Sequence, residues 1–437
     1  MKFAIIGKGT SALVSSMIVL RRGHQVEHFY DPDTPFLRVG ESTTPHVSCL
    51  MRDVLGMCIG TFVDDGIVSY KNGVHFVDWG VGGEFTHPFN SNHNAFHLDN
   101  KRWNDYVIGI LESKRGVKFH PERYEGYEVT DHDTIMINGK EFDFIINCSG
   151  WQDDDSYDEP LIETVNSALL HHIPEMKEYH HTIHLATKHG WQFQLPFPEL
   201  NGGESHCGYL YNNKLTSDEE AVADLKRMYG EDHQFKMIKW KPRFARQMIK
   251  DRFEAFQGNR LFFLEPLQAL SLDYYKLLCE DITDFAERRD YATFCQVNQK
   301  YRSEMIDYQY ALALHYQFGS VYGGNGQGDS KFWNWVTPRA RHNLKFHPVT
   351  CDDKLFFDFM NVDTQTSDDL STPYQWKEQI RPEDYTAKGR PNVGHTLTTC
   401  LQIAGFNYFD TKTLYCGFNQ IRFLEFEDKY KGLPRNE

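Results

Sequence analysis

The chain of 437 residues has no long apolar run and no cluster of positive charge. Without about 18 consecutive apolar residues, no segment is expected to cross a membrane as a helix. The opening MKFAIIGKG lacks the apolar core and the Ala-x-Ala site of a signal peptide. Asp and Glu number 61 against 46 Lys and Arg, for a net charge of −15, whereas nucleic-acid binding draws on clustered positive charge. These absences predict a soluble cytoplasmic protein, with neither a membrane nor a nucleic acid as its partner.

Paired cysteines are missing as well. The nine cysteines are scattered and odd in number and form no C-x-x-C pair, which is typical of reduced thiols and not of a disulfide framework. The histidine-rich segment HHIPEMKEYHHTIH (171–184) has neither a nearby cysteine nor an HExxH pattern. We therefore expect no metal site, and we interpret this segment as a solvated helix and loop.

Aromatic residues, by contrast, are abundant, at 14% of the chain. Hydrophobic residues make up 40%, which in a chain of this length is enough for a large buried core and more than one small domain. Most of the rings must pack in that core. The remainder could line a pocket for a flat, apolar ligand.

The N-terminal segment KFAIIGKGTSALVSSMIVLRRGHQVEHFYD has the order strand, glycine-rich turn, helix, strand, acid. Phe3–Ile6 is an apolar run suited to a buried parallel strand. A helix is expected to run to about Arg22, and a second strand to follow over Gln25–Tyr30. The turn before the helix has the pattern G-x-G-x-x-A, which is formed by Gly7, Gly9, Thr10, Ser11 and Ala12.

This turn predicts a dinucleotide site. The glycines permit a tight turn and close backbone approach, and the small Ala12 lets helix and strand pack. The N–H groups at the start of the helix then face a pyrophosphate. Asp31 stands where an acid would hold the ribose hydroxyls, although the neighbouring Tyr30 leaves the register open. A merely structural strand–helix–strand unit is the weaker interpretation.

A second segment indicates which dinucleotide binds. FIINCSG (144–150) is expected to be a later parallel strand that ends in a small-residue turn at Ser149 and Gly150. A flavin enzyme returns to the adenine half of its cofactor at such a turn. GGNGQGDS (323–330) lies between aromatic segments and is expected to be a flexible loop, not a second nucleotide turn. The chain is therefore expected to bind FAD and to receive its electrons from elsewhere.

Several separated motifs carry a resemblance to a known family. They are VGESTTP (39–45), YKNGVHFVDW (70–79), FHLDNKRWNDYV (96–107), FIINCSGW (144–151), GWQFQLP (190–196), FLEPLQALSL (263–272), LHYQFG (314–319) and DSKFWNWV (329–336). Through them the chain, up to about residue 340, resembles the flavin-dependent halogenases of the tryptophan-halogenase type. GWQFQLP corresponds to the family's G-W-x-W-x-I-P, and EPLQALSL to its E-P-L-E-S-T-G-I.

The resemblance implies an α/β fold, with a Rossmann-like FAD-binding domain of the GR2 flavin monooxygenase type and a mainly helical substrate and cap region. Residues 1–340 would form the FAD-binding halogenase core with interleaved substrate-side segments, and 341–437 would complete the cap. FAD would arrive as FADH2 from a separate flavin reductase and would act with O2 and halide; a homo-oligomer is compatible with this. The further residues expected to contact FAD are Gly40, Glu41, Ser42, Thr43, Thr44, Ser149 and Gly150.

The resemblance also implies a chemistry. In the family, reduced FAD and O2 turn halide into hypohalous acid, which travels through the protein to a lysine beside an aromatic substrate. Lys71 matches that lysine, and the backbone N–H groups at Leu270 and Ser271 match the halide site. A wall between flavin and substrate is matched by Trp191, Phe193 and Pro196. The competing interpretation of GWQFQLP is a buried strand whose end is set by the proline. A lone lysine in a strand is more often a surface residue, although the place of Lys71 between Tyr70 and the alternating apolar stretch GVHFVDW would let its side chain point inward.

Two departures from the family pattern affect what is expected. The glutamate of E-P-L-E-S is Gln268 here, and a neutral amide can neither act as a base nor stabilise a cationic arenium intermediate by charge. This favours substrates that stabilise the intermediate themselves, namely phenols, pyrroles and electron-rich indoles, with bromide and iodide at least as suitable as chloride. QGNRLFFLEPL (257–267) passes from an expected strand over Arg260–Leu264 into Glu265 without the usual Gly/Ala-rich turn, which predicts loosely held FAD.

Two other functions remain open from the sequence. A flavin monooxygenase that hydroxylates or epoxidises its substrate would share the fold but would need neither Lys71 nor the wall. A flavin-binding protein without halogenating activity would account for Gln268 and for the missing turn.

Residues 217–257 and 273–345 are expected to be helices of the cap, because apolar positions recur in them at helical spacing.

Overall fold

The computed structural model describes residues 1–34, 41–43, 45–56, 59–80, 83–88, 95–150, 152, 154–174, 180–197, 204–267, 270–317, 319–324, 326 and 328–344. Three of the expected site residues, Gly40, Thr44 and Gln268, lie outside this set, as does nearly all of the expected C-terminal region 341–437. Of the helices within these ranges, none is both long and apolar enough to cross a membrane.

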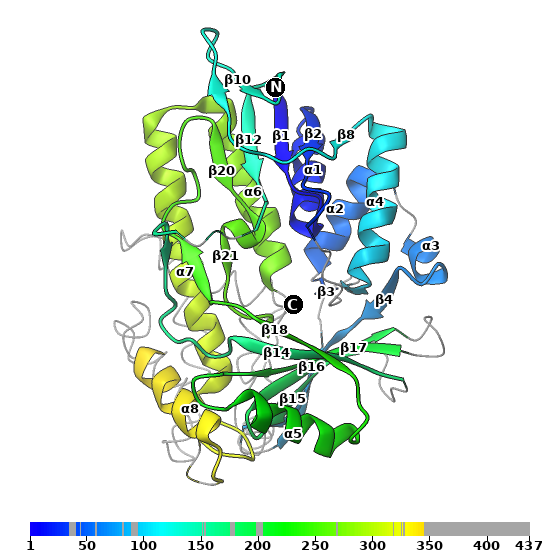
Figure 1. Cartoon of the computed structure of the whole chain (residues 1–437), viewed down its shortest axis with the longest axis vertical. Coiled ribbons are helices and arrows are strands. Elements are labelled where there is room, and N and C mark those ends of the chain that lie inside the picture. Colours follow the sequence, from blue (N-terminus) through cyan, green and yellow to red (C-terminus); the bar gives the residue numbers. More distant parts are fainter. Residues whose placement is uncertain are drawn as a thin grey trace, which may run out of the picture.

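A five-stranded parallel sheet forms one half of the molecule (Figure 1). Its order is β20–β12–β1–β2–β8, and each neighbouring pair is parallel. The strands are β1 (Lys2–Ile6), β2 (Gln25–Phe29), β8 (Lys118–His120), β12 (Phe144–Asn147) and β20 (Glu254–Phe256). The apolar residues of β1 are almost wholly buried, as expected for a central strand with both faces covered.

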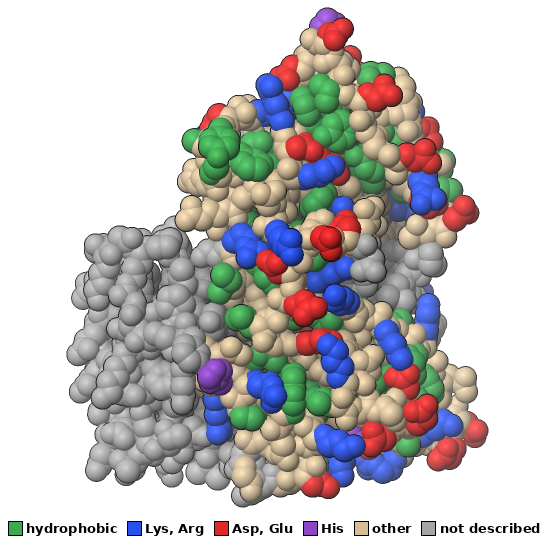
Figure 2. Space-filling model, turned by 60° about the vertical axis from the view of Figure 1, so that its left-hand side comes forward, with side chains coloured by type: hydrophobic (Ala, Val, Ile, Leu, Met, Phe, Trp, Pro, Cys, Tyr) green, Lys and Arg blue, Asp and Glu red, His purple; other side chains and the backbone are tan. Residues whose placement is uncertain are grey.

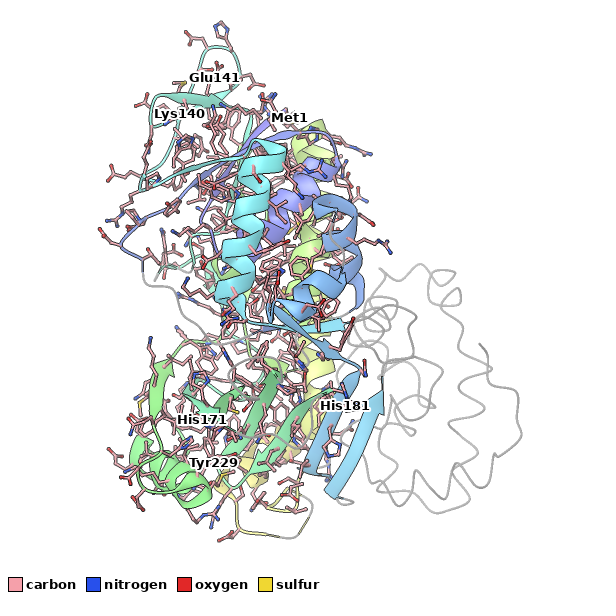
Figure 3. The ribbon with its side chains drawn as sticks, turned by 90° about the vertical axis from the view of Figure 1, so that its right-hand side faces the viewer. Met1, Lys140, Glu141, His171, His181 and Tyr229 are labelled. Carbon is pink, nitrogen blue, oxygen red and sulfur yellow. The ribbon has the colours of Figure 1, made fainter. Side chains whose placement is uncertain are left out.

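Helices pack beside this sheet. The first helix, α1 (Thr10–Arg21), follows β1 and packs against α2 (Pro45–Leu55), α4 (Asn100–Arg115) and α6 (Leu270–Arg288). A short helix, α3 (Ile59–Asp64), precedes β4. A small antiparallel sheet extends from the far end of this half, where Figure 3 labels Lys140 and Glu141. Its strands are β9 (Glu128–Val129), β10 (Ile135–Ile137) and β11 (Lys140–Phe142).

A seven-stranded sheet forms the other half, in the order β18–β14–β17–β16–β15–β5–β6. All pairs are antiparallel except β5 with β15. Helix α5 (Asp218–Tyr229) covers the outer face, where its Leu225 packs with Leu169 and Tyr209. The strands are β5 (Gly73–Trp79), β6 (Gly83–Pro88), β14 (Ser167–Ile173), β15 (His181–Thr187), β16 (Gly190–Phe197), β17 (Glu204–Tyr211) and β18 (Phe235–Lys239).

Two three-stranded sheets and two further helices connect the halves. The sheets are β3 (Glu41–Ser42), β7 (Ala95–Leu98) and β4 (Val68–Lys71), and β13 (Tyr157–Asp158), β19 (Arg243–Ala245) and β21 (Phe262–Phe263). The helices are α7 (Tyr291–Tyr316) and α8 (Lys331–Leu344). The ring of Phe285 on α6 lies 6.0 Å from that of Phe144 in β12, and Tyr316 on α7 lies 5.6 Å from Trp79 in β5. One cluster of buried apolar residues includes side chains from both sheets and from these helices, so the two halves share one apolar core.

Charges of both signs are mixed over the surface. On the face in Figure 2, Lys and Arg side chains lie among Asp and Glu side chains over the described residues. A mixed surface of this kind gives little long-range attraction for a polyanion.

Three expectations about secondary structure are wrong. Over 217–257 helix α5 ends at Tyr229, and strands β18, β19 and β20 follow it. The segment that was expected to be a helical cap is therefore in large part made of strands. The segment 171–184 contributes the end of β14 and the start of β15 instead of a solvated helix. The strand expected over Arg260–Leu264 is reduced to Phe262–Phe263, after a 3-10 turn at Gly258–Arg260. These strands have two to seven residues, which is too short for a period of two to show, and their partners are distant in sequence.

Candidate functional site

A cavity of about 920 Å³ lies between the parallel sheet and the seven-stranded sheet. Its lining combines the turn after β1, the end of β2, strand β3, the turn after β12, the inner face of the seven-stranded sheet and the start of α6. A cavity of this size can bury most of a large organic ligand. Most of the nucleotide-site residues expected from the sequence meet around it.

The turn after β1 forms a cradle at one end of the cavity. The lining residues here are Gly7, Gly9, Thr10 and Ser11, with Ala12 buried behind them. Gly7 has φ +112°, and a Cβ on it would lie 3.0 Å from the carbonyl oxygen of Cys148. Helix α1 begins at Thr10, and the preceding Gly9 has no side chain with which to cap it. Because the first N–H groups of a helix lack intrahelical partners, this cradle fits the pyrophosphate of FAD.

A further glycine supports the cradle from segment 257–267, in which the sequence was expected to have no glycine-rich turn. Gly258 has φ +62°, and a Cβ on it would lie 2.2 Å from Ser11 Oγ. The next residue, Asn259, lines the cavity. A turn that contains a glycine is therefore present before Glu265, and it is shorter than the Gly/Ala-rich turn of the usual flavoenzyme pattern. The Gly-Asn pair between two apolar runs was the available signal.

The residues at the end of β2 face the same cavity. The sequence left open which of Tyr30 and Asp31 takes the ribose-binding position. Both residues line the cavity, so both belong to the site. Asp31 Oδ1 accepts a hydrogen bond from the Asp33 N–H at 2.9 Å. Lys8 Nζ lies 3.8 Å from the centre of the Tyr30 ring, within range of a cation–π interaction. A carboxylate, a cation and a ring are thus collected where the adenosine half of FAD would lie.

The remaining residues expected to contact flavin line the middle of the cavity. They are Glu41, Ser42, Ser149 and Gly150, with Thr43 buried beside them. Glu41 Oε1 accepts a hydrogen bond from Thr10 Oγ1 at 3.0 Å, which connects β3 to the start of α1. Burial raises the pKa of Glu41 to about 7. Ser149 is held by Asn147 Oδ1, which accepts from its N–H at 3.1 Å and from its hydroxyl at 2.7 Å.

Lys71 ends strand β4, and its side chain is only 1% exposed. Its Nζ donates to Ser42 Oγ at 3.1 Å and to the Thr43 carbonyl at 3.3 Å. Ser42 in turn lines the cavity, so the buried amine lies just behind the cavity surface. After burial itself, the charge of Lys71 is the next largest factor lowering the pKa of two imidazoles, His97 and His184.

Trp191 and Phe193 lie on one face of β16, as a spacing of two residues in a strand requires. Phe193 lines the cavity. Its ring occupies the space over Gly208 of β17, where a Cβ would come within 2.4 Å of Phe193 Cε1. Trp191 is fully buried, with its ring 6.3 Å from that of Trp79 and 5.0 Å from that of His184. The two rings thus lie on the same face of the sheet, Phe193 at the cavity and Trp191 in the aromatic cluster beside it; we refer to these two rings as the aromatic layer.

Pro196 does not lie in this layer. By the alternation of the strand it faces the side opposite to Phe193, and β16 continues past it to Phe197. The expectation that the proline closes the strand is therefore wrong. Pairing of β16 with β15 ends at Gln194, so the missing N–H of Pro196 falls where β15 no longer follows. The Pro196 carbonyl accepts a hydrogen bond from Ser69 Oγ at 2.5 Å, which fixes β16 against β4.

The expected halide site coincides with a helix start. Leu270 is the first residue of α6, and Ser271 and Leu272 line the cavity. The backbone N–H groups in the first turn of this 19-residue helix have no acceptor within the helix, and this end of the helix carries a partial positive charge. This arrangement suits a small anion.

Glu265, three residues before Gln268, faces a different environment. Its side chain is 1% exposed, and Oε2 accepts from Thr164 Oγ1 at 2.6 Å and from Tyr316 OH at 2.8 Å. Burial raises the pKa of Glu265 to about 7. It is absent from the cavity lining among the described residues, so it does not stand in for the family glutamate there.

Sequence analysis missed two cavity residues in the histidine-rich segment, Thr182 and His184. Both are 2% exposed and lie on one face of β15. The alternation T-I-H-L-A over 182–186 was the signal that could have revealed a half-buried strand. Within the described ranges no group of three or more potential ligands is close enough to hold a metal ion.

Comparison with protein families gives one match over most of the chain. A sequence model described as tryptophan halogenase matches residues 2–94 and 90–347. Among curated proteins, tryptophan 7-halogenase RebH from Lentzea aerocolonigenes is 20% identical over 476 residues, covering 87% of this chain and 86% of its own.

Solved structures agree on the fold. Tryptophan 6-halogenase SttH from Streptomyces toxytricini has a TM-score of 0.66 at 17% identity, over 79% of this chain and 84% of its own. A tryptophan halogenase from Shewanella frigidimarina has a TM-score of 0.68 at 14% identity, over 100% of this chain and 96% of its own. The architecture is therefore that of the flavin-dependent halogenases, as the sequence motifs predicted.

Proposed function

Because the chain belongs to the tryptophan halogenase family, and so is a flavin-dependent halogenase, we propose that it halogenates an electron-rich aromatic compound by way of Lys71. The proposed substrates are phenols, indoles and pyrroles, and the proposed halides are bromide, iodide and chloride. FADH2 would come from a separate flavin reductase.

The observation that carries this proposal is the burial of Lys71 beside the cavity. Lysine is almost never fully buried unless it is paired, because removing an ammonium group from water is costly. Here Lys71 is 1% exposed, and its amine donates hydrogen bonds to Ser42 Oγ and to the Thr43 carbonyl beside the cavity. A lysine kept in such a place can serve as a nucleophile or as a hydrogen-bond donor to hypohalous acid.

The lining of the cavity supports FAD as the cofactor. Bound FADH2 would supply, with O2, the oxidising power that converts halide into hypohalous acid. Gly7, Gly9 and the first turn of α1 would hold the pyrophosphate, and Asp31 the ribose. The first turn of α6, at Leu270 and Ser271, would hold the halide near the middle of the cavity.

The aromatic layer would keep the two reactions apart. Phe193 faces the cavity and Trp191 is buried on the same face of β16, so a bulky substrate beyond these rings would not reach the flavin directly. Phe193 replaces the family's second tryptophan, and its ring is accommodated by Gly208. The smaller ring still covers the face of β17 at Gly208, the residue paired with Phe193.

The choice of substrate follows from Gln268. Without a carboxylate at this position, the positive charge of an arenium intermediate must be stabilised by the substrate itself. A hydroxyl or ring nitrogen on the substrate donates electrons and does this. Free tryptophan is then a poorer candidate than phenols, pyrroles or activated indoles.

The test is mass spectrometry of products from purified protein supplied with FAD, NADH and a generic flavin reductase. A panel of phenols, indoles and pyrroles would be offered with each halide in turn. We expect halide-dependent mass increases that disappear in Lys71→Met, whose side chain keeps much of the buried volume. Lys101→Ala removes an exposed lysine on α4 and should leave the product yield unchanged. A gain of one oxygen that depends on neither halide nor Lys71 would instead show a monooxygenase.

A further inference from the structure

Lys71 reaches across a small sheet to a hydrogen-bond partner. The strand order of this sheet is β3–β7–β4, with Lys71 on β4 and Ser42 on β3. The hydrogen bond of 3.1 Å from Lys71 Nζ to Ser42 Oγ therefore spans β7. The residue opposite Lys71 on β7 is Ala95, whose small side chain leaves room for the lysine to cross. The amine is thereby brought to the edge of the sheet that β3 forms.

Ser42 connects this amine to the cavity. Ser42 is 7% exposed and belongs to the cavity lining. The second acceptor of the amine is the Thr43 carbonyl, at 3.3 Å, and a carbonyl has no proton to give. A serine hydroxyl, by contrast, can accept one hydrogen bond and donate another at the same time. Ser42 is therefore a partner of Lys71 through which a proton can move to the cavity.

The neighbouring imidazole does not compete for the Ser42 hydroxyl. His97 on β7 is paired with Ser42 in the strand register, but both of its ring nitrogens are engaged elsewhere. Ser69 gives its hydroxyl proton to the Pro196 carbonyl, at 2.5 Å, so His97 Nδ1 must donate to Ser69 Oγ, at 3.2 Å. Burial holds the pKa of His97 well below 6.5, so Nε2 of the neutral ring accepts from Thr182 Oγ1 at 3.0 Å. Within the described part of the chain, the structure shows no protein acceptor for the Ser42 hydroxyl.

The segment that carries both acceptors of Lys71 is held in place by backbone hydrogen bonds. The Thr43 N–H donates to the Phe96 carbonyl at 2.7 Å, and Thr43 Oγ1 accepts from the Phe96 N–H at 2.9 Å. Strand β3 also pairs with β7 at Ser42. The amine and the hydroxyl are therefore kept at hydrogen-bond distance, as proton transfer requires.

A protonated lysine cannot attack a halogen directly. An ammonium group donates hydrogen bonds but has no lone pair to share, so Lys71 must lose a proton before an N–X bond can form. Hypohalous acid has the complementary need, because the hydroxide that leaves when its O–X bond breaks is stabilised by gaining a proton. One proton transferred from the amine to this oxygen serves both needs. A hydroxyl that lies between the amine and the cavity can carry it.

On the basis of the proposed function, we propose that Ser42 passes a proton from Lys71 to the oxygen of hypohalous acid as the halogen moves to the amine. Ser42 gives its own hydroxyl proton to that oxygen and receives one from Lys71. The N–X bond forms with the electron pair that the departing proton leaves on nitrogen. The O–X bond breaks, its electron pair stays on oxygen, and water departs. The positive charge remains on nitrogen, as an N-halogenated ammonium group.

The cycle closes when the aromatic substrate takes the halogen. The C–X bond forms with an electron pair of the ring, the N–X bond breaks, and its electron pair stays on nitrogen. The proton that the ring then loses returns to Lys71, which is again an ammonium group. The halogen is already oxidised in hypohalous acid, so neither step needs a further oxidant or reductant. No separate base is required, which suits a chain in which Gln268 replaces the family glutamate.

A competition between two acceptors of the halogen tests this role. Purified protein would receive bromide, FAD, NADH, flavin reductase and the aromatic compound that wild type halogenates best, with an excess of a β-diketone that traps free hypobromous acid. In Ser42→Ala, hypobromous acid should still form but should escape to the trap. The ratio of brominated substrate to brominated trap should therefore fall by about tenfold or more. Ser42→Thr, which keeps a hydroxyl, should restore most of the ratio.

The ratio separates this role from a defect in folding or in FAD binding, because both products come from the same hypobromous acid. The matched control is Ser205→Ala, which removes another buried hydroxyl. Ser205 lies on β17, donates to the Ile173 carbonyl at 3.2 Å and is absent from the cavity lining among the described residues. Its ratio should equal that of wild type. An equal ratio in Ser42→Ala and wild type would overturn the inference, whereas a wild type that brominates no aromatic compound would contradict the proposed function on which the inference rests.

A second measurement does not depend on halogenation. Lysines labelled with nitrogen-15 at Nζ would be followed by NMR, with the Lys71 signal assigned from its loss in Lys71→Met. Ser42→Ala removes one acceptor of the amine, so the Lys71 signal should move, whereas Ser205→Ala should leave it in place. A Lys71 signal that does not move in Ser42→Ala would show that the two groups do not bond in solution and would overturn the inference.

Discussion

Lys71 shows how one residue can be recognised from its neighbours in the sequence while its partners cannot. Its place between Tyr70 and an alternating apolar stretch suggested an inward side chain, and the structure buries it. Its hydrogen-bond partners Ser42 and Thr43 are 29 and 28 residues away and lie outside β4. A single sequence does not contain such contacts, because they depend on how the sheets assemble.

Glu265 is a second buried charge whose behaviour can be predicted at the residue scale. Its pKa rises from an ordinary 4.5 to about 7, chiefly because burial disfavours the carboxylate. The native state therefore binds the proton more tightly than the unfolded state. Its contribution to stability is complete below pH 4.5 and is lost as the pH rises through 7. At about 1.4 kcal/mol per pKa unit, the loss is on the order of 3 kcal/mol.

Glu265→Gln should remove this pH dependence, because the amide remains neutral and can still accept from Thr164 and Tyr316. Urea unfolding at pH 5 and pH 8 would give the free energy of unfolding for both proteins. Wild type should lose on the order of 3 kcal/mol more than the variant between the two pH values. Glu125→Gln, at an exposed position, is the control and should follow wild type. Equal losses in all three would contradict the prediction.

At the scale of elements, the predictable parts are those whose pattern is local. The first strand, glycine turn and helix lie within 20 residues, and β1 and α1 fall where the sequence placed them. Strands β14 and β15 were mistaken for a helix and loop because their histidines hide the alternation. The 3-10 turn at Gly258 was missed because its purpose, contact with Ser11, depends on a residue 247 positions earlier.

This turn gives a prediction about how elements cooperate to bind FAD. Gly258→Ala would place a methyl group 2.2 Å from Ser11 Oγ and push the 3-10 turn away from the start of α1. Because Ser11 belongs to the pyrophosphate cradle, we expect FAD binding to weaken by about tenfold or more, or about 1.4 kcal/mol. Titration of FAD fluorescence would measure the affinity.

A control variant separates the effect of backbone strain at the glycine from the effect of contact with Ser11. Gly139 has φ +74°, close to the +62° of Gly258, and a Cβ there would meet no atom within 4 Å. Gly139→Ala should therefore lose a similar 1–2 kcal/mol of folding stability from the left-handed conformation, but bind FAD as wild type does. Equal FAD affinities for the two variants would show that Gly258 does not shape the cradle.

At the scale of the whole molecule, the cavity lies between two sheets that share one core. Its adenosine end is formed by the parallel sheet and its far wall by the seven-stranded sheet. A ligand that fills it makes contacts with both halves and should stabilise them together. Sequence motifs could identify each side of the cavity, but not that the inner face of a seven-stranded sheet would close it.

Oxidised FAD should therefore raise the melting temperature of the chain, and the two halves should unfold together in one transition. At a hundred times its dissociation constant, FAD adds about 2.7 kcal/mol, which corresponds to roughly 3–5 °C for a chain of this length. FMN at the same concentration should shift the temperature by about 1 °C or less, since it lacks the adenosine half that Gly7, Gly9 and Asp31 would hold. Differential scanning fluorimetry would give both values. Asp31→Asn should reduce the FAD shift, whereas Asp33→Asn, at an exposed side chain, should preserve it. Equal shifts from FMN and FAD would show that the adenosine half makes no contribution, and the assignment of the β1–α1 turn as the dinucleotide cradle would then be wrong.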